Sequence, residues 1–154
     1  MLGREEQKLR NSQFWEGFRN YIKKIPSSNG RRMNWLNYPS DVKGIYIRLQ
    51  CDHLGARLCM DFQQKDPGIR AILWEQMTEL KKLLEEAMKY PTRWDPDCMS
   101  PEGFAFGRIH WELEGKSFYK DEDWPEIYSF LCDRLVEFDE FYQEFKEILI
   151  TLSE

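Results

Sequence analysis

The sequence predicts an α+β domain: an antiparallel sheet of four or five strands with three helices packed on one face, the last being a long C-terminal helix. Two observations carry this prediction. Apolar residues alternate over two neighbouring segments near the middle of the chain, which is typical of a β-hairpin. Near the C-terminus, apolar residues recur every three or four positions for about thirty residues, which is typical of a helix. The second face of the sheet is expected to stay polar.

A first helix is predicted over about residues 5–25, because its apolar residues recur at helical spacing and a Pro-Ser-Ser-Asn-Gly segment follows. Met33 and Trp35 occupy alternate positions in the next segment, so we expect a short strand within residues 31–38. The apolar positions of the first helix are Phe14, Trp15, Phe18, Tyr21, Ile22 and Ile25.

A β-hairpin is predicted over about residues 43–63, with its turn at residues 52–55. With that turn, antiparallel pairing sets every apolar residue opposite another apolar residue, and a slip by one residue would destroy the match. The expected apolar pairs are Ile45 with Phe62, Ile47 with Met60, and Leu49 with Leu58.

The rest of the chain is predicted to form a helix, a strand and a final helix. A helix is expected over about residues 68–89, and a strand over about residues 105–114 that extends the same sheet. The C-terminal helix is expected over about residues 124–152. Asp123 would be its N-cap, Pro125 would lie in its first turn and Glu126 would take the capping-box position.

The composition predicts a single domain over residues 1–154. The chain is 42% hydrophobic and 15% aromatic, which is enough for a core at this size. Its net charge of −5 disfavours general nucleic-acid binding, and no apolar run is long enough to span a membrane. We therefore expect a cytoplasmic protein without a membrane partner. Its four dispersed cysteines are expected to be reduced thiols, with no metal site and no cofactor.

The polar face of the predicted sheet is the first choice for a ligand site. If the hairpin and the later strand share one sheet, their polar residues converge on that face. Arginines beside aromatic rings can bind an anion or a base, whereas cross-strand ion pairs on a solvated face are the plainer interpretation. The candidate residues are Tyr46, Arg48, Arg57, Asp61, Arg108, His110 and Glu112.

The sequence contains no catalytic constellation. Asp95 or Asp97 followed by Glu114-Gly115-Lys116 imitates the carboxylate and lysine pattern of a metal-dependent nuclease. The same carboxylate-x-lysine spacing occurs at four other places in this charged chain, so we interpret it as chance. His53 is expected in the hairpin turn and His110 on the polar face, where surface histidines are ordinary.

Phe14-Trp15, Trp35, the hairpin from Ile45 to Phe62, Trp94, Arg108-Ile109 and, most specifically, Asp123-Trp124-Pro125-Glu126 follow one another along the chain. This order of signals resembles a bacterial family catalogued as domain of unknown function 4268, from about Ser12 to Leu149. The resemblance implies the fold above and no catalytic residue. Members of the family often look like C-terminal parts of larger proteins with nuclease-like domains, whereas here we expect the domain to stand alone.

Two functions follow as hypotheses. The first is a non-catalytic interaction module that binds a protein partner or a second copy of itself, because a helix of about thirty residues overruns a small sheet and needs cover. A homodimer would fit this hypothesis. The second is an accessory nucleic-acid-binding or nuclease-associated protein that uses the arginine-bearing face, which the acidic composition disfavours.

Overall fold

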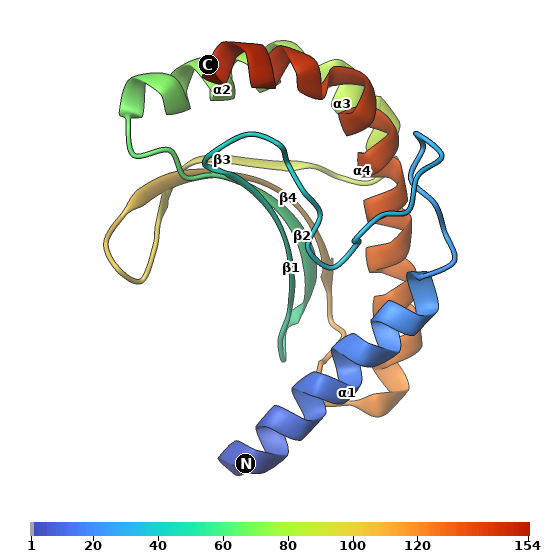
Figure 1. Cartoon of the computed structure of the whole chain (residues 1–154). Helices are drawn as coiled ribbons and strands as arrows, with labels where there is room; N and C mark the ends of the chain where they lie inside the picture. Colours follow the sequence, from blue (N-terminus) through green and yellow to red (C-terminus); the bar gives the residue numbers. More distant parts are fainter. Residues whose placement is uncertain (1) are drawn as a thin grey trace.

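The computed structural model describes residues 2–154 and combines one four-stranded antiparallel sheet with four α-helices (Figure 1), which confirms the predicted α+β class. A short 3-10 turn at Asp121–Asp123 precedes the last helix. The elements in chain order are α1 Arg4–Ile22, β1 Ile45–Cys51, β2 Gly55–Phe62, α2 Pro67–Glu79, α3 Lys81–Met88, β3 Arg93–Met99, β4 Ala105–Glu114 and α4 Trp124–Ser153.

The sheet is strongly curved, and its strand order is β1-β2-β4-β3. The helices lie along its outer, convex side, and the concave side is free of helices (Figure 1). Helix α4 contacts β2 and β4, and α2 contacts β2, whereas α1 and α3 pack chiefly against α4. None of the helices within residues 2–154 is long and apolar enough to cross a membrane.

The register of the β1–β2 hairpin is confirmed residue by residue. Ile45 lies opposite Phe62, Ile47 opposite Met60 and Leu49 opposite Leu58. Ile47 is 7% exposed and Met60 is fully buried, so the apolar side of the hairpin faces the helices. Since this register also sets which residues of the hairpin face the concave side, it positions Tyr46, Arg48, Arg57 and Asp61 of the candidate site.

Helix α4 runs unbroken for 30 residues and bends along the convex side of the sheet (Figure 1). Pro125 lies in its first turn, as the sequence predicts. Asp123 is the N-cap residue, as predicted, but the expected capping bond is absent. Its carboxylate makes no hydrogen bond to the helix and instead accepts one from the Ser117 backbone N–H at 2.8 Å. Glu126 lies 3.6 Å from Lys116 Nζ. Both acids thus tie the β4–α4 loop to the helix start.

Two helix boundaries differ from the sequence-based expectation. Helix α1 ends at Ile22 rather than near Ile25, where the chain turns so that the Ile25 carbonyl accepts the Trp35 indole N–H at 2.9 Å. The helix expected over residues 68–89 is divided at Leu80 into α2 and α3. Leu80 has φ −90° and ψ 5°, which departs from the helical backbone, and its side chain is 9% exposed.

Two strand predictions need correction. Residues 31–38 are a loop rather than a strand, and the Asn29 and Asn34 side chains accept backbone N–H bonds within it. Such local bonds compete with strand pairing. Conversely, Arg93–Met99 forms β3, where the sequence analysis predicts no strand. Asp95, Pro96 and Asp97 are residues that disfavour strands.

One face of α4 holds the long loop of residues 23–44 in place. The buried carboxylate of Asp139 accepts bonds from the Tyr38 hydroxyl at 2.5 Å and the Ser27 hydroxyl at 3.0 Å. The Tyr142 hydroxyl donates to the Ser40 carbonyl at 2.6 Å, and Lys146 pairs with an exposed aspartate of the loop. These helix residues are three and four positions apart and so share one face. The loop is therefore fixed directly before β1 begins.

Replacing Asp139 by alanine should destabilise the protein by about 2–4 kcal/mol, because it leaves the hydroxyls of Ser27 and Tyr38 buried without their acceptor. The matched control is Lys146→Ala, which removes a more exposed pair and should cost less than about 1 kcal/mol. Urea unfolding at unchanged m-value measures both. Equal losses in the two variants would contradict this role of Asp139.

Candidate functional site

The seven candidate residues all lie on the concave side of the sheet, where neighbouring strands bring them into rows. Asp61 lies opposite Arg108 and Tyr46 in the register, and Arg57 lies opposite Glu112. The β2–β4 pairs of these rows are the non-hydrogen-bonded pairs of the ladder, in which side chains approach most closely. We call this set, together with Cys59 and Arg93, the concave face. The structure therefore brings all seven predicted residues together.

A buried ion pair lies at the centre of the concave face. The Asp61 carboxylate is fully buried and accepts two hydrogen bonds from Arg108, from Nε at 2.7 Å and from the guanidinium NH2 group at 2.9 Å. These bonds raise the pKa of Arg108 further above its ordinary value. Arg48 Nε is 3.8 Å from the same carboxylate. A bidentate pair of this kind fixes both side chains, and their paired hydrogen-bonding groups are then unavailable to a ligand.

A second ion-pair network covers the other end of the face. Arg57 lies 3.1 Å from Asp52 and 3.2 Å from Glu112, and Arg93 bridges Glu112 at 3.2 Å and Glu114 at 2.6 Å. Each arginine of this network is thus shared between two carboxylates. Counting Asp52 and Glu114 of this network, four carboxylates face the four arginines of the concave face, which is a poor match to a phosphate backbone.

The side chains of the concave face are less exposed to solvent than the sequence analysis expects. Only Tyr46 and Arg48 of the seven residues are exposed, and the Arg48 guanidinium lies 4.8 Å from the centre of the Tyr46 ring. The other five are buried or half-buried. Curvature explains the difference, since side chains on the inside of a bent sheet crowd together and cover one another.

Cys59 and His110 lie directly opposite each other on β2 and β4. A cysteine beside a histidine is the pair that cysteine nucleophiles use, so the juxtaposition requires a chemical assessment. Burial raises the pKa of the Cys59 thiol to about 12, and burial together with the charge of Arg108 lowers the pKa of His110. The thiol is fully buried, so at neutral pH it is a protonated core group and no nucleophile.

The nuclease-like pattern of the sequence does not form a site. Asp95 pairs with Arg108 in the β3–β4 register, whereas Glu114 lies six positions further along β4, about 20 Å away in an extended strand. Glu114 is bound by Arg93, and Lys116 faces Glu126. Residues 2–154 contain no group of three or more histidine, cysteine or acidic side chains that could hold a metal ion.

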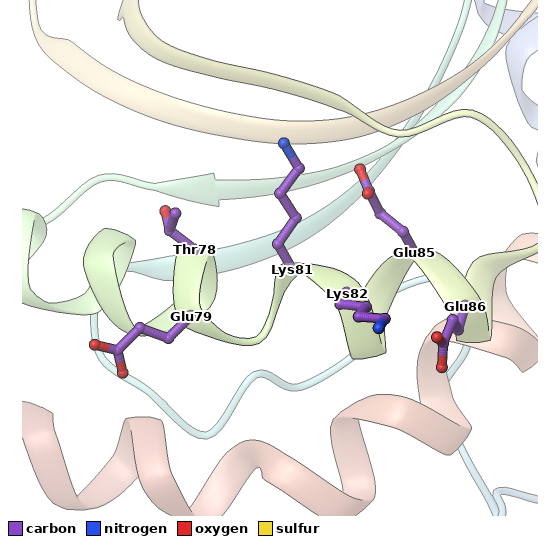
Figure 2. A pocket seen from close by; sticks show the side chains of 6 residues that line it. All are labelled: Thr78, Glu79, Lys81, Lys82, Glu85 and Glu86. Carbon is purple, nitrogen blue, oxygen red and sulfur yellow. The ribbon is translucent and has the colours of Figure 1, made fainter.

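Figure 2 shows a shallow depression on α2 and α3 in which the charged side chains do not meet at one point. Lys81 and Glu85 extend toward the sheet, where Lys81 Nζ lies 5.6 Å from the centre of the Trp94 ring and Glu85 accepts the Trp94 indole N–H at 3.2 Å. Glu79 and Glu86 point the opposite way (Figure 2). These contacts attach α3 to β3 and do not form a binding site.

The outer edge of β1 offers a run of unused backbone groups within the described residues. The Gly44 carbonyl accepts the Gln63 N–H at 2.7 Å, and the Asp52 N–H donates to Gly55 at 2.9 Å, so even-numbered residues of β1 bond to β2. The backbone groups of odd-numbered residues therefore point outward. Ile45 already uses its outward groups, because its N–H donates to Val42 and its carbonyl accepts the Ser40 hydroxyl.

Within residues 2–154, no hydrogen bond reaches the outward N–H and C=O groups of Ile47, Leu49 and Cys51. We call these groups the open edge. A depression lined by residues 37–48 lies beside the start of β1, between the strand and the loop that α4 holds. Sequence reasoning missed the open edge, since the alternation of the hairpin indicates which side chains are buried but not which strand is outermost.

The opposite edge of the sheet is protected against pairing. Strand β3 contains Pro96, which cannot donate a hydrogen bond, and its register with β4 shifts between Asp95 and Cys98. Asp95 and Asp97 add exposed charges. Proline, charge and a bulge are the devices by which natural sheets block edge-to-edge association. Strand β1 has none of them except the charge of Arg48, so the two edges differ sharply.

Replacing Arg108 by methionine should destabilise the protein by about 3–5 kcal/mol, because Asp61 would remain buried without its main partner. Replacing the exposed Arg48 by methionine should cost less than about 1 kcal/mol. The double variant Asp61→Leu with Arg108→Met should be closer to the parent than Arg108→Met alone. Chemical unfolding measures all three, and equal effects of Arg48 and Arg108 would contradict this account of the face.

The imidazole of His110 should titrate below the ordinary histidine pKa, because its environment disfavours the charged form. The unfolded chain then binds a proton at a higher pH than the folded chain. Stability should therefore fall as the pH drops from about 6.5 through the lower folded pKa, and His110→Gln should remove this contribution. An NMR titration of the ring protons tests it, and a midpoint at or above the ordinary value would refute it.

Comparison with known proteins yields one finding. No curated protein and no solved structure shows significant similarity to this chain. A family model described as "Domain of unknown function (DUF4268)" matches residues 10–146, a span that includes every strand, most of α1 and all but the last turns of α4. On this match, the chain belongs to the DUF4268 family.

Proposed function

We propose that this protein is a non-catalytic interaction module that binds an extended segment of a protein at the open edge of β1. The single observation that carries the proposal is the set of unused outward groups on Ile47, Leu49 and Cys51. A partner strand would pair with these groups by main-chain hydrogen bonds and add itself to the sheet. The depression lined by residues 37–48 could take side chains of the partner and so give specificity.

The asymmetry of the sheet supports this proposal. An unprotected edge exposes a protein to unwanted pairing, so natural sheets block their edges. Here β3 is blocked by Pro96 and two aspartates while β1 is left open, although both are outermost strands. Side chains on the apolar side of the edge are also incompletely covered, since Leu49 and Cys51 are only half-buried. A paired strand would cover both.

The concave face speaks against the alternative of a nucleic-acid-binding protein. Three of its arginines are held by carboxylates at 3.2 Å or less, and only Arg48 has loose contacts. Binding a phosphate backbone would require these ion pairs to break. The face has no activated nucleophile either, because Cys59 is buried as a thiol. We therefore propose that these ion pairs stabilise the sheet and do not bind a nucleic acid.

A selection of random peptides on the immobilised protein tests the proposal. Peptides should be selected on the parent protein alone and then measured on Leu49→Pro, which removes the central outward N–H and leaves the bonds to β2 intact. We expect the selected peptides to slow hydrogen exchange at the amides of Ile47, Leu49 and Cys51. The control variant is Phe104→Ser, which changes an exposed apolar residue at the tip of the β3–β4 hairpin and should leave peptide binding unchanged.

The proposal fails if the selected peptides bind Leu49→Pro as well as the parent, provided that circular dichroism shows the variant to be folded. It also fails if bound peptides protect amides elsewhere, such as those of the β3–β4 hairpin, and leave the open edge unchanged.

A further inference from the structure

We infer that the occupant of the open edge is a second copy of this chain, paired antiparallel so that Leu49 lies opposite Leu49 of the second copy. The inference rests on the proposed function and names its partner. In this dimer the two sheets join into one continuous sheet across a two-fold axis at Leu49. Such an interface is isologous, because the same strand contributes from both sides.

The register follows from which backbone groups are free. Ile45 uses its outward N–H and C=O inside the chain, so the free groups belong to Ile47, Leu49 and Cys51. Leu49 is the middle of these three. A two-fold axis at Leu49 sets Ile47 opposite Cys51 of the second copy, and every free group of both strands finds a partner.

On both faces of the joined sheet, this register sets compatible side chains opposite each other. On the apolar side, the half-buried Leu49 and Cys51 would meet Leu49 and Ile47 of the second copy. On the concave side, Tyr46 would face Asp52 of the second copy and Arg48 would face Gln50. These polar pairs fall at non-hydrogen-bonded positions, where cross-strand contacts are closest. No like charges face each other.

The neighbouring registers are worse for reasons visible in the structure. An axis at Arg48 would set the two Arg48 side chains opposite each other and would require the outward groups of Ile45, which are taken. An axis at Ile47 would also require Ile45 and would leave Cys51 opposite Lys43. Like charges directly opposite in a sheet are unfavourable. An axis at Gln50 or Cys51 would set Ile47 opposite a residue beyond the end of β1, so only the axis at Leu49 pairs all the free groups.

The strand interface is short, so the dimer should be weak. Interfaces of this size lie at the small end of those that specify a complex, and we expect a dissociation constant on the order of ten to a few hundred micromolar. Sedimentation velocity over about 5 µM to 1 mM then covers the transition from monomer to dimer.

Two variants test the pairing and its register in the full chain. Leu49→Pro should weaken dimerisation about tenfold or more, because the central pair loses its hydrogen bonds and gains steric conflict. Gln50→Glu should tighten the dimer by about fivefold, since each Arg48 gains an opposite charge across the axis. The second variant is a mild surface change and retains an acceptor for Arg57 within the chain.

Leu49→Ala is the matched control, because it shortens the side chain but keeps the outward N–H, and it should dimerise more tightly than Leu49→Pro. Concentration-dependent dimers that respond to Leu49→Pro and Gln50→Glu as described would establish the interface. A monomer at every concentration would overturn the inference. A dimer whose dissociation constant is unchanged by Gln50→Glu would overturn it as well. If the chain stays monomeric while selected peptides still protect the open edge, only the identity of the partner is wrong and the proposed function stands.

Discussion

The register of the β1–β2 hairpin is the constraint on which the rest of this structure depends. In an antiparallel ladder, one parity of residue bonds to the neighbouring strand and the other points its backbone outward. In β1 the odd-numbered residues carry both the apolar side chains and the outward backbone groups. The register that buries Ile47 under the helices therefore also determines which backbone groups point outward, and it places Tyr46 and Arg48 on the concave face. A slip by one residue would exchange all three properties together.

Packing of helix α4 and the curvature of the sheet stabilise the structure that this register determines. The helix covers the convex side and, through Asp139 and Tyr142, holds the loop that leads into β1. That loop supplies Ser40, whose hydroxyl occupies the first outward carbonyl of the strand. On the concave side, crowding buries Asp61, and a buried carboxylate requires a partner such as Arg108. The ion pairs of the concave face thus follow from its shape and need no ligand to explain them.

The sequence predicts those parts of the fold that have local periodicity. Alternation predicts the hairpin register, and the three-and-four spacing predicts the extent of α4. Strand β3 escapes prediction because its pairing with β4 overrides the poor strand propensity of Asp95 and Pro96. The division at Leu80 could not be predicted, because no glycine or proline marks it. The side chains of the candidate face can be grouped from the sequence, but the burial of Asp61 and the outermost position of β1 require the strand order.

Amide hydrogen exchange along β1, followed by NMR in dilute solution, tests the central claim most directly. At concentrations too low for self-association, the account predicts an alternating pattern: slow exchange at Tyr46, Arg48 and Gln50, whose N–H groups bond to β2, and fast exchange at Ile47, Leu49 and Cys51. Uniformly slow exchange along the strand, or the opposite alternation, would contradict the account, because the edge would then be covered within one chain or the register would be shifted.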